Sequence, residues 1–151
     1  MLLFAVLLAA SVPPADEAAI FGTAGFTQRG GKWRTDCADP SSSGYEHGAI
    51  DTYGDLNGDG RPEAVVTEGG TFCYGNTGAG FWLLSKQENG KWATLYQSQG
   101  SAEFLKTSGV GKMPDISVGG PGFCFPVVRW NGKAYVQNRF EYEGKACRPE
   151  Q

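Results

Sequence analysis

The chain is poor in histidine, the residue that most often activates a serine or cysteine nucleophile. Its 151 residues include one histidine, His47. Any Ser-His or Cys-His arrangement would have to run through that side chain, which sits in a stretch rich in Ser and Gly, Ser41 to Gly48, typical of an exposed loop. The G-x-S-x-G, P-loop and H-E-x-x-H motifs are missing too. The sequence therefore indicates a protein that is not an enzyme.

Basic charge and long apolar segments are scarce as well. The chain has 13 Lys and Arg residues against 16 Asp and Glu residues, a formal net charge of −3 and a pI near 5.1. Binding to a phosphate backbone needs a basic stripe, which this chain lacks, so nucleic acid is not an expected partner. Beyond residue 10, no segment is apolar and long enough to span a bilayer.

The first ten residues form the longest apolar run of the chain. Met1 to Ala10, MLLFAVLLAA, is too short to cross a membrane and is followed by Ser11-Val12-Pro13-Pro14. This pattern predicts a signal peptide cleaved between residues 10 and 15, and hence a secreted or periplasmic protein. Because no Lys or Arg precedes the run, a buried N-terminal helix and a misplaced start remain open alternatives.

The cysteines indicate disulfides rather than a metal or redox centre. There are four, and none forms a C-x-x-C pair. An even number in an exported chain predicts two disulfides, for which three connectivities are possible. We favour Cys37 with Cys73 and Cys124 with Cys147, because each pair brackets neighbouring hairpins.

Short aromatic and β-branched runs separated by turn dipeptides dominate the chain from Phe26 onwards. They predict a mainly β fold (α+β with one or two short helices) in a single domain spanning residues 16–151. Helices are expected over Asp16 to Ala24, capped by Gly25, and over Ala102 to Thr107. Strands are expected over residues 26–28, 32–34, 49–53, 63–67, 81–86, 91–97, 115–118, 125–130, 133–137 and 139–142.

A loop rich in oxygen-bearing side chains precedes one of these strands. In Asp55 to Val66, DLNGDGRPEAVV, the side chains of Asp55, Asn57 and Asp59 take positions 1, 3 and 5, and Glu63 takes position 9. Hard cations such as calcium bind through several oxygen ligands at this spacing. An EF-hand or dockerin loop is excluded, because position 12 is Val66 rather than Glu. A plain turn without an ion remains the alternative.

The strand after this loop has an echo later in the chain. Pro62-Glu63-Ala64-Val65-Val66 corresponds to Pro114-Asp115-Ile116-Ser117-Val118, and each copy continues through Gly-Gly to Phe-Cys and an Asn-Gly-Lys turn. A period near 50 residues suggests two halves built from blade-like antiparallel units. Chance similarity of short Gly-rich β sequences is the alternative.

The Asp55 to Val66 segment resembles the FG-GAP and VCBS repeats of secreted bacterial proteins and integrin-like propellers. The resemblance is close over about a dozen residues. It implies that calcium is held by the side chains of Asp55, Asn57, Asp59 and Glu63 and by the backbone carbonyl of Arg61. The second copy lacks the corresponding carboxylates and should not bind metal. Two units cannot close a propeller, so we expect a compact sandwich or paired sheet, or self-association.

Three functions remain open on these grounds. The first is a non-catalytic, exported, calcium-stabilised β domain that binds a protein or carbohydrate at the cell envelope, or serves there as a structural module. The second is a small secreted inhibitor that inserts Ser43-Gly44-Tyr45 into a hydrolase. The third is a hydrolase using carboxylates among Glu68, Asp51 and Asp115.

Aromatic side chains and polar loops supply the candidate contact surfaces. Trp33 and Trp92 follow Gly-Lys turns and are expected to be more exposed than Trp82, which is expected in the core; Trp130 also lies near a hairpin. The segments Ser41 to Gly48 and Tyr74 to Gly80 are expected to be recognition loops.

Overall fold

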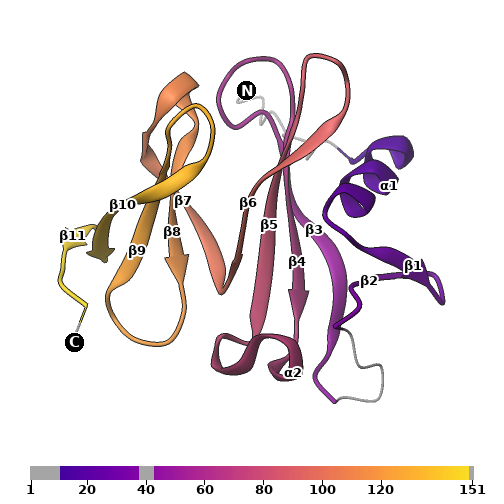
Figure 1. Ribbon diagram of the computed structural model, residues 1–151, viewed down its shortest axis with the longest axis horizontal. Coiled ribbons are helices and arrows are strands. Elements are labelled where there is room, and N and C mark those ends of the chain that lie inside the picture. The colour runs from indigo at the N-terminus through magenta and orange to yellow at the C-terminus, as the bar shows by residue number, and fades with distance from the viewer. Residues whose placement is uncertain (1–10, 38–42, 150–151) are drawn as a thin grey trace, which may run out of the picture.

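The computed structural model of the chain describes residues 11–37 and 43–149. Figure 1 shows two antiparallel β-sheets side by side, with helix α1 (Pro14–Thr23) on the outer side of the first sheet. The protein is therefore mainly β, with two short α-helices and paired antiparallel sheets, as the sequence predicts. The expected signal peptide, residues 1–10, lies outside the described residues.

Each large sheet is an antiparallel meander. The first has the order β3-β4-β5-β6 and consists of β3 (Glu46–Gly54), β4 (Glu63–Gly69), β5 (Ala79–Lys86) and β6 (Trp92–Gln99). The second has the order β11-β10-β9-β8-β7 and consists of β7 (Ser101–Ser108), β8 (Pro114–Gly119), β9 (Phe125–Trp130), β10 (Tyr135–Tyr142) and β11 (Lys145–Ala146). A separate hairpin pairs β1 (Thr27–Arg29) with β2 (Lys32–Arg34).

The two sheets are built in the same way. The repeated segments that begin at Pro62 and Pro114 supply the second strand of each sheet, β4 and β8. Gly100 alone joins β6 to β7, so the chain passes directly from one sheet to the other. Equivalent positions of the two copies therefore occupy equivalent places in the two sheets.

The helix expected over Ala102 to Thr107 is wrong, because these residues belong to strand β7. The segment contains good helix formers, but Ala102 and Phe104 both pack against the core between the sheets. Their spacing of two residues is the period of a strand with one buried face. Tertiary packing therefore overrides the local helix propensity here. The strands expected over 133–137 and 139–142 form one strand, β10, with a register shift between Gln137 and Arg139.

Helix α1 seals the outer face of the first sheet. It begins with Pro14, whose fixed φ suits the first helical turn, and carries Asp16 and Glu17 there. Asp16 fastens the helix to the sheet by accepting hydrogen bonds from three side chains, those of Lys86 (3.0 Å), Tyr53 (3.0 Å) and Trp92 (3.3 Å). The core beneath the helix consists of Ile20, Phe21, Phe26, Ala64, Val66, Trp82, Leu84 and Trp92.

A second core fills the space between the two sheets. It consists of Val65, Phe81, Leu83, Met113, Ile116, Val118, Val128 and Tyr135. Val65 and Val66 are neighbours on β4 but belong to different cores, because successive side chains point to opposite faces of a strand. This explains why β4 reads as a continuous apolar run although the fold is antiparallel.

Both expected disulfides are confirmed. Cys37 bonds to Cys73 with a Cα–Cα distance of 5.8 Å, and Cys124 bonds to Cys147 with a Cα–Cα distance of 5.9 Å. In the chain-entropy account, loops of 36 and 23 residues give roughly 3 to 4 kcal/mol each.

The connections gather at two ends of the sheets (Figure 1). The upper end carries the β3–β4 loop, residues 55–62, and the β5–β6 turn. The lower end carries α2 (Thr71–Tyr74), the short helix η1 (Gly75–Thr77) and the β8–β9 connection, residues 120–124. No helix in the described ranges is long and apolar enough to cross a membrane.

Candidate functional site

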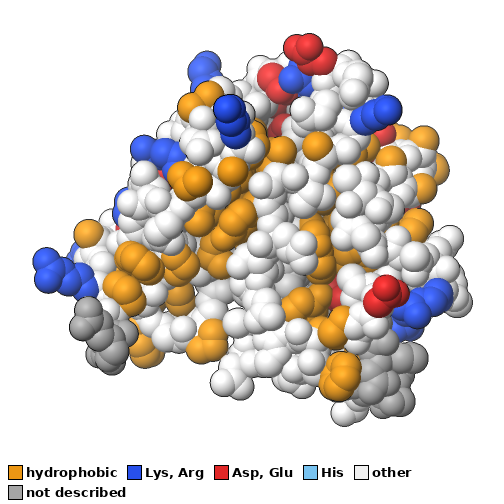
Figure 2. Space-filling view, viewed as in Figure 1, with side chains coloured by type: hydrophobic (Ala, Val, Ile, Leu, Met, Phe, Trp, Pro, Cys, Tyr) orange, Lys and Arg blue, Asp and Glu red, His pale blue; other side chains and the backbone are white. Residues whose placement is uncertain are grey.

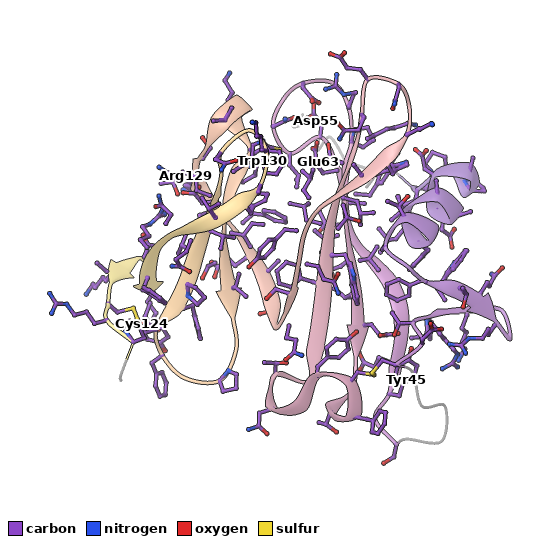
Figure 3. All side chains as sticks on the ribbon, in the orientation of Figure 1. Tyr45, Asp55, Glu63, Cys124, Arg129 and Trp130 are labelled. Atoms are coloured by element: carbon purple, nitrogen blue, oxygen red, sulfur yellow. A yellow bond between two sulfur atoms is a disulfide. The ribbon has the colours of Figure 1, made fainter. Side chains whose placement is uncertain are left out.

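The loop at the upper end is organised around the carboxylate of Asp55 (Figure 3). Asp55 Oδ1 accepts backbone N–H groups from Gly58 (2.8 Å), Asp59 (3.2 Å) and Asn57 (3.3 Å), and Oδ2 accepts that of Gly60 (2.8 Å). These donors, first that of Gly60, lower the pKa of Asp55. Asp55 is therefore ionised at neutral pH and fixes the turn.

The other loop carboxylate, Asp59, makes two contacts with Arg61. Its Oδ1 accepts the backbone N–H of Arg61 at 2.8 Å, and its Oδ2 pairs with the Arg61 guanidinium at 3.0 Å. Asn57 Oδ1 accepts the N–H of Asp59 at 3.2 Å. The side chains of Asp55, Asn57 and Asp59 thus accept hydrogen bonds within one compact turn.

Glu63 lies directly below this loop and is fully buried. Its Oε2 accepts the N–H of Leu56 (2.8 Å) and its Oε1 accepts the hydroxyl of Ser85 (3.0 Å). Burial raises the pKa of Glu63, and the nearby charges of Asp59 and Asp55 raise it further. No Lys or Arg of the described chain is paired with this carboxylate.

The donor set suits a hard cation in its chemistry, since Asp55, Asn57, Asp59 and Glu63 offer side-chain oxygens and Arg61 a backbone oxygen. The carboxylates are not gathered at one point: the described residues contain no group of three or more Asp, Glu, His or Cys side chains arranged to hold a metal. Glu63 instead serves Leu56 and Ser85. Calcium binding at this loop remains a proposal.

A second buried carboxylate, Glu68, ties together the lower end of the first sheet. It accepts hydrogen bonds from the hydroxyls of Tyr45 (2.6 Å), Tyr74 (2.7 Å) and Thr35 (2.7 Å) and from the Thr35 N–H (3.0 Å). Burial alone would raise the pKa of Glu68, but these donors outweigh it and lower the pKa. The Tyr45 ring is thus anchored inward, which leaves Ser43 and Gly44 as the exposed part of the expected inhibitor loop. Ser41 and Ser42 lie outside the described residues.

The carboxylates considered for a hydrolase lie in separate environments. Glu68 belongs to the network on the first sheet, whereas Asp115 lies on the outer face of the second sheet, bonded to Arg129, Arg139 and Thr107. Asp51 is exposed on β3. His47 is exposed near the start of β3, and its ring contacts the Gly48 carbonyl at 3.0 Å. The structure therefore does not bring these candidate residues together.

The tryptophans are not the exposed aromatics of this protein. Trp82 is buried, as expected, but Trp92 is buried too, because its ring closes the α1 core and its Nε1–H is satisfied by Asp16. Trp33 is half-buried and stacks on Phe21 with a centroid distance of 4.8 Å. The expectation that Trp92 would be exposed is wrong.

Two phenylalanines, neither of them expected at the surface, are exposed instead. Phe72 is 69% exposed and Phe123 is 76% exposed. Each directly precedes a disulfide-bonded cysteine in its copy of the repeat, and both belong to connections at the lower end (Figure 1). The sequence feature that could have predicted their exposure is the Gly-Gly turn that precedes each Phe-Cys pair, because turns lie at the surface.

Fold and geometry define a disulfide-bonded domain of two stacked antiparallel meanders, with a polar loop at one end and exposed aromatic rings at the other. Comparison of the chain with protein-family models, with curated proteins and with solved structures finds no match.

Proposed function

We propose that this chain is a non-catalytic, exported, calcium-stabilised β domain that acts as a binding or structural module of the cell envelope. The observation that supports a binding role most directly is the pair of exposed rings, Phe72 and Phe123. Large apolar side chains held in water at equivalent places are typical of contact surfaces.

The surface formed by the two lower connections suits an extended ligand. A hollow of about 390 Å³ lies where the two lower connections meet. Its lining is small and polar and includes Asn76, Thr77, Ser101, Gly120 and Pro121. A hollow with polar side chains and exposed backbone, on the same two connections that carry exposed aromatic rings, suits a carbohydrate or a peptide. Figure 2 shows hydrophobic side chains reaching this end of the molecule.

The disulfides support export. Two bonds that link all four cysteines are typical of proteins in oxidising compartments, such as the periplasm or the extracellular medium. They also hold both phenylalanine-bearing connections in place, which reduces the entropy lost when a ligand binds.

The calcium part of the proposal is supported by the Asp55 loop and by the resemblance of Asp55 to Val66 to FG-GAP and VCBS repeats. A cation beside Glu63 would offset the burial, and the repulsion from Asp59 and Asp55, that raise the pKa of this carboxylate. Sites of extracellular type have dissociation constants of about 0.1 to 1 mM. At about 1 mM free calcium, linkage then gives roughly 0.4 to 1.4 kcal/mol of stabilisation.

Thermal unfolding with calcium and with a chelator tests the ion. A stabilisation of this size should raise Tm by about 1 to 5 °C. Asp59→Ala should abolish the shift, whereas Asp51→Ala, at an exposed position on β3, should keep it. An unshifted wild type, or the same shift in Asp59→Ala, would remove calcium from the proposal.

Sedimentation with insoluble peptidoglycan or cellulose tests the binding role. Wild type should be depleted from solution by at least one of these polymers. The double variant Phe72→Ser with Phe123→Ser should stay in solution. Asp51→Ala, at an exposed position on β3, should sediment like wild type. Equal sedimentation of all three proteins would exclude the lower end as the contact surface.

A further inference from the structure

The outer face of the second sheet contains a pocket of about 380 Å³ that combines carboxylates with aromatic rings. We call it the acidic aromatic pocket. It is formed by strands β7 to β10 and the β10–β11 turn. Its lining includes Glu103, Ser117, Phe125, Glu141, Tyr142 and Glu143.

The pocket lies on a face of the second sheet whose equivalent face in the first sheet is buried between the two sheets. Glu63 and Asp115 are equivalent in the two copies, so Val65 on β4 corresponds to Ser117 on β8. Val65 is buried against the second sheet, whereas Ser117 lies beside the pocket on the side where, in the described part of the chain, no further sheet or helix covers it. The second sheet thus presents to solvent a surface whose counterpart is interior.

Ser117 indicates that this surface has room for a polar ligand group. Ser117 as a whole is 7% exposed, and it lines the pocket. Its hydroxyl forms no hydrogen bond with any other described side chain or backbone group, although Thr107 and Asp115 on the same face are bonded to each other. Ser117 Oγ is not fully enclosed, in contrast to Arg34 Nη1, the buried side-chain atom without a partner in the described residues. The hydroxyl is therefore available to a donor or acceptor in the pocket.

The charges around the pocket favour a cation. Three glutamates line it, and no Lys or Arg does. Glu141 accepts a hydrogen bond from Arg139 Nε at 2.6 Å, and that guanidinium is also bonded to the buried Asp115. Glu103 and Glu143 form no ion pair within the described residues. Two uncompensated carboxylates therefore face any group that enters.

The aromatic rings favour an organic cation over a metal ion. Phe125 and Tyr142 pack edge to face with a centroid distance of 5.9 Å and form an apolar wall. Such a wall attracts ammonium and guanidinium groups and buries their methylene stems. A bare metal ion would gain nothing from it, and the carboxylates of the pocket are not gathered around one point.

The same face continues into a second hollow, which points to a polypeptide rather than a free amine. That hollow, of about 510 Å³, is lined by the exposed side chains of Val110 and Val136, beside Arg129. Val136 and Arg129 are cross-strand neighbours, and Arg129 is bonded to Asp115 on the outer face. A chain lying along the face would meet an acidic site and an apolar site in succession.

We propose that the outer face of the second sheet docks a basic polypeptide, with one lysine or arginine side chain inserted into the acidic aromatic pocket. The ammonium or guanidinium group lies between Glu103 and Glu143, its stem packs on Phe125 and Tyr142, and Ser117 pairs with a polar group of the ligand. The inference rests on the binding role proposed above and assigns it a second surface.

Amide NMR titration of the isotope-labelled chain tests the pocket. The probes are an end-blocked Ala-Ala-Lys-Ala-Ala peptide, the same peptide with acetylated lysine, and free cadaverine. The lysine peptide should shift the amides of Ser117, Phe125 and Glu143 and bind about tenfold more tightly than the acetylated peptide. Equal binding of the two peptides, or no shift, would overturn the cation pocket. Cadaverine binding as tightly as the lysine peptide would overturn the polypeptide as its occupant.

Variants separate this pocket from the lower end. The double variant Glu103→Gln with Glu143→Gln changes two exposed residues and should weaken the lysine peptide about tenfold. Glu88→Gln, at a side chain that is 90% exposed in the β5–β6 turn, should bind like wild type. Unchanged affinity in the double variant would overturn the proposal. Sedimentation that depends on Phe72 and Phe123, without any lysine-peptide shift, would overturn the pocket while leaving the proposed function standing.

Discussion

Asp115 on β8 and Arg129 on β9 form a bidentate ion pair on the outer face of the second sheet. Arg129 Nε donates to Oδ1 at 2.9 Å and Nη2 donates to Oδ2 at 2.8 Å, and the carboxylate is fully buried. In the first sheet the equivalent carboxylate, Glu63, accepts a neutral hydroxyl from Ser85. The carboxylate enclosed between the sheets, Glu63, is thus bonded to an uncharged side chain. Its equivalent on the outer face, Asp115, is bonded to a charged one.

Asp115→Asn should destabilise the second sheet. The substitution keeps the shape but leaves Arg129 and Arg139 without their shared carboxylate. Breaking a buried pair costs about 3 to 5 kcal/mol. Because the arginine side chains are 37% and 26% exposed, water compensates in part, and we expect a loss of about 2 to 3 kcal/mol. Urea unfolding measures it, with Asp51→Asn as the exposed control.

The same ion pair should make the free energy of unfolding depend on pH in the acid range. Burial would raise the pKa of Asp115, but hydrogen bonds from Arg129, Thr107 and Arg139 hold it well below its usual range. The ionised form therefore stabilises the fold fully above the unfolded-state pKa of about 3.9, and this contribution is lost as the pH falls towards the lowered native value. The stability gap between wild type and Asp115→Asn should narrow below about pH 4. A constant gap would contradict this assignment.

Glu68→Gln should loosen the lower end of the first sheet. The amide replaces one acceptor oxygen with a donor, which then faces a hydroxyl or N–H that needs an acceptor. We expect a loss of about 1 to 3 kcal/mol in unfolding free energy, against no change in Glu88→Gln. Burial, then the hydrogen bond to Glu68 and after it the Glu68 charge, raise the pKa of Tyr45 and Tyr74. Phenolate absorbance should therefore appear at lower pH in the variant.

Gly48→Ala and Gly22→Ala should have opposite effects. A Cβ at Gly48 would lie 2.6 Å from Phe26 Cε1 and 3.0 Å from Phe21 Cε1, in the core beneath α1. Overpacking of this kind costs about 1 to 3 kcal/mol. A Cβ at Gly22, inside helix α1, would meet nothing within 4 Å, so alanine there should add about 0.5 to 1 kcal/mol. Thermal melts measure both effects. Changes in Tm of the same sign in the two variants would contradict the packing of α1 on the first sheet.

Removal of the second disulfide should affect the C-terminal strand most. Cys124→Ser with Cys147→Ser releases a loop of 23 residues, for which the chain-entropy account gives about 3 kcal/mol. Amide exchange should accelerate in β11 while the first sheet keeps its protection. Equal acceleration in both sheets would show that the bond supports the whole fold.

The strand pattern was largely predictable because turns and alternation are local. The boundaries of β2 and β9 coincide with the expected ones, and both disulfides join the cysteines that bracket neighbouring hairpins, as expected. The helix predicted for Ala102 to Thr107 is wrong because the local propensity of this segment is helical. Its burial as one face of a strand depends on packing against the second core, most of which lies far away in sequence.

The candidate sites were less predictable, because exposure depends on the assembled sheets. Phe72 and Phe123 look like ordinary core residues in sequence, and Trp92 looks like a surface residue until helix α1 covers it. The acidic aromatic pocket is lined by residues as far apart in sequence as Glu103 and Glu143, so no local motif predicts it. The polar loop at Asp55 was visible because all its residues are consecutive.

Helix α1 also limits how copies of this chain can combine. It occupies the outer face of the first sheet, so each chain offers a single sheet face for stacking in the part that the structure describes. Head-to-tail growth into a fibre needs two such faces. Two chains that pack face to face would each bury this one sheet face, so association would end at a dimer. Because that pair would bury the acidic aromatic pocket, dimerisation and peptide binding would exclude each other.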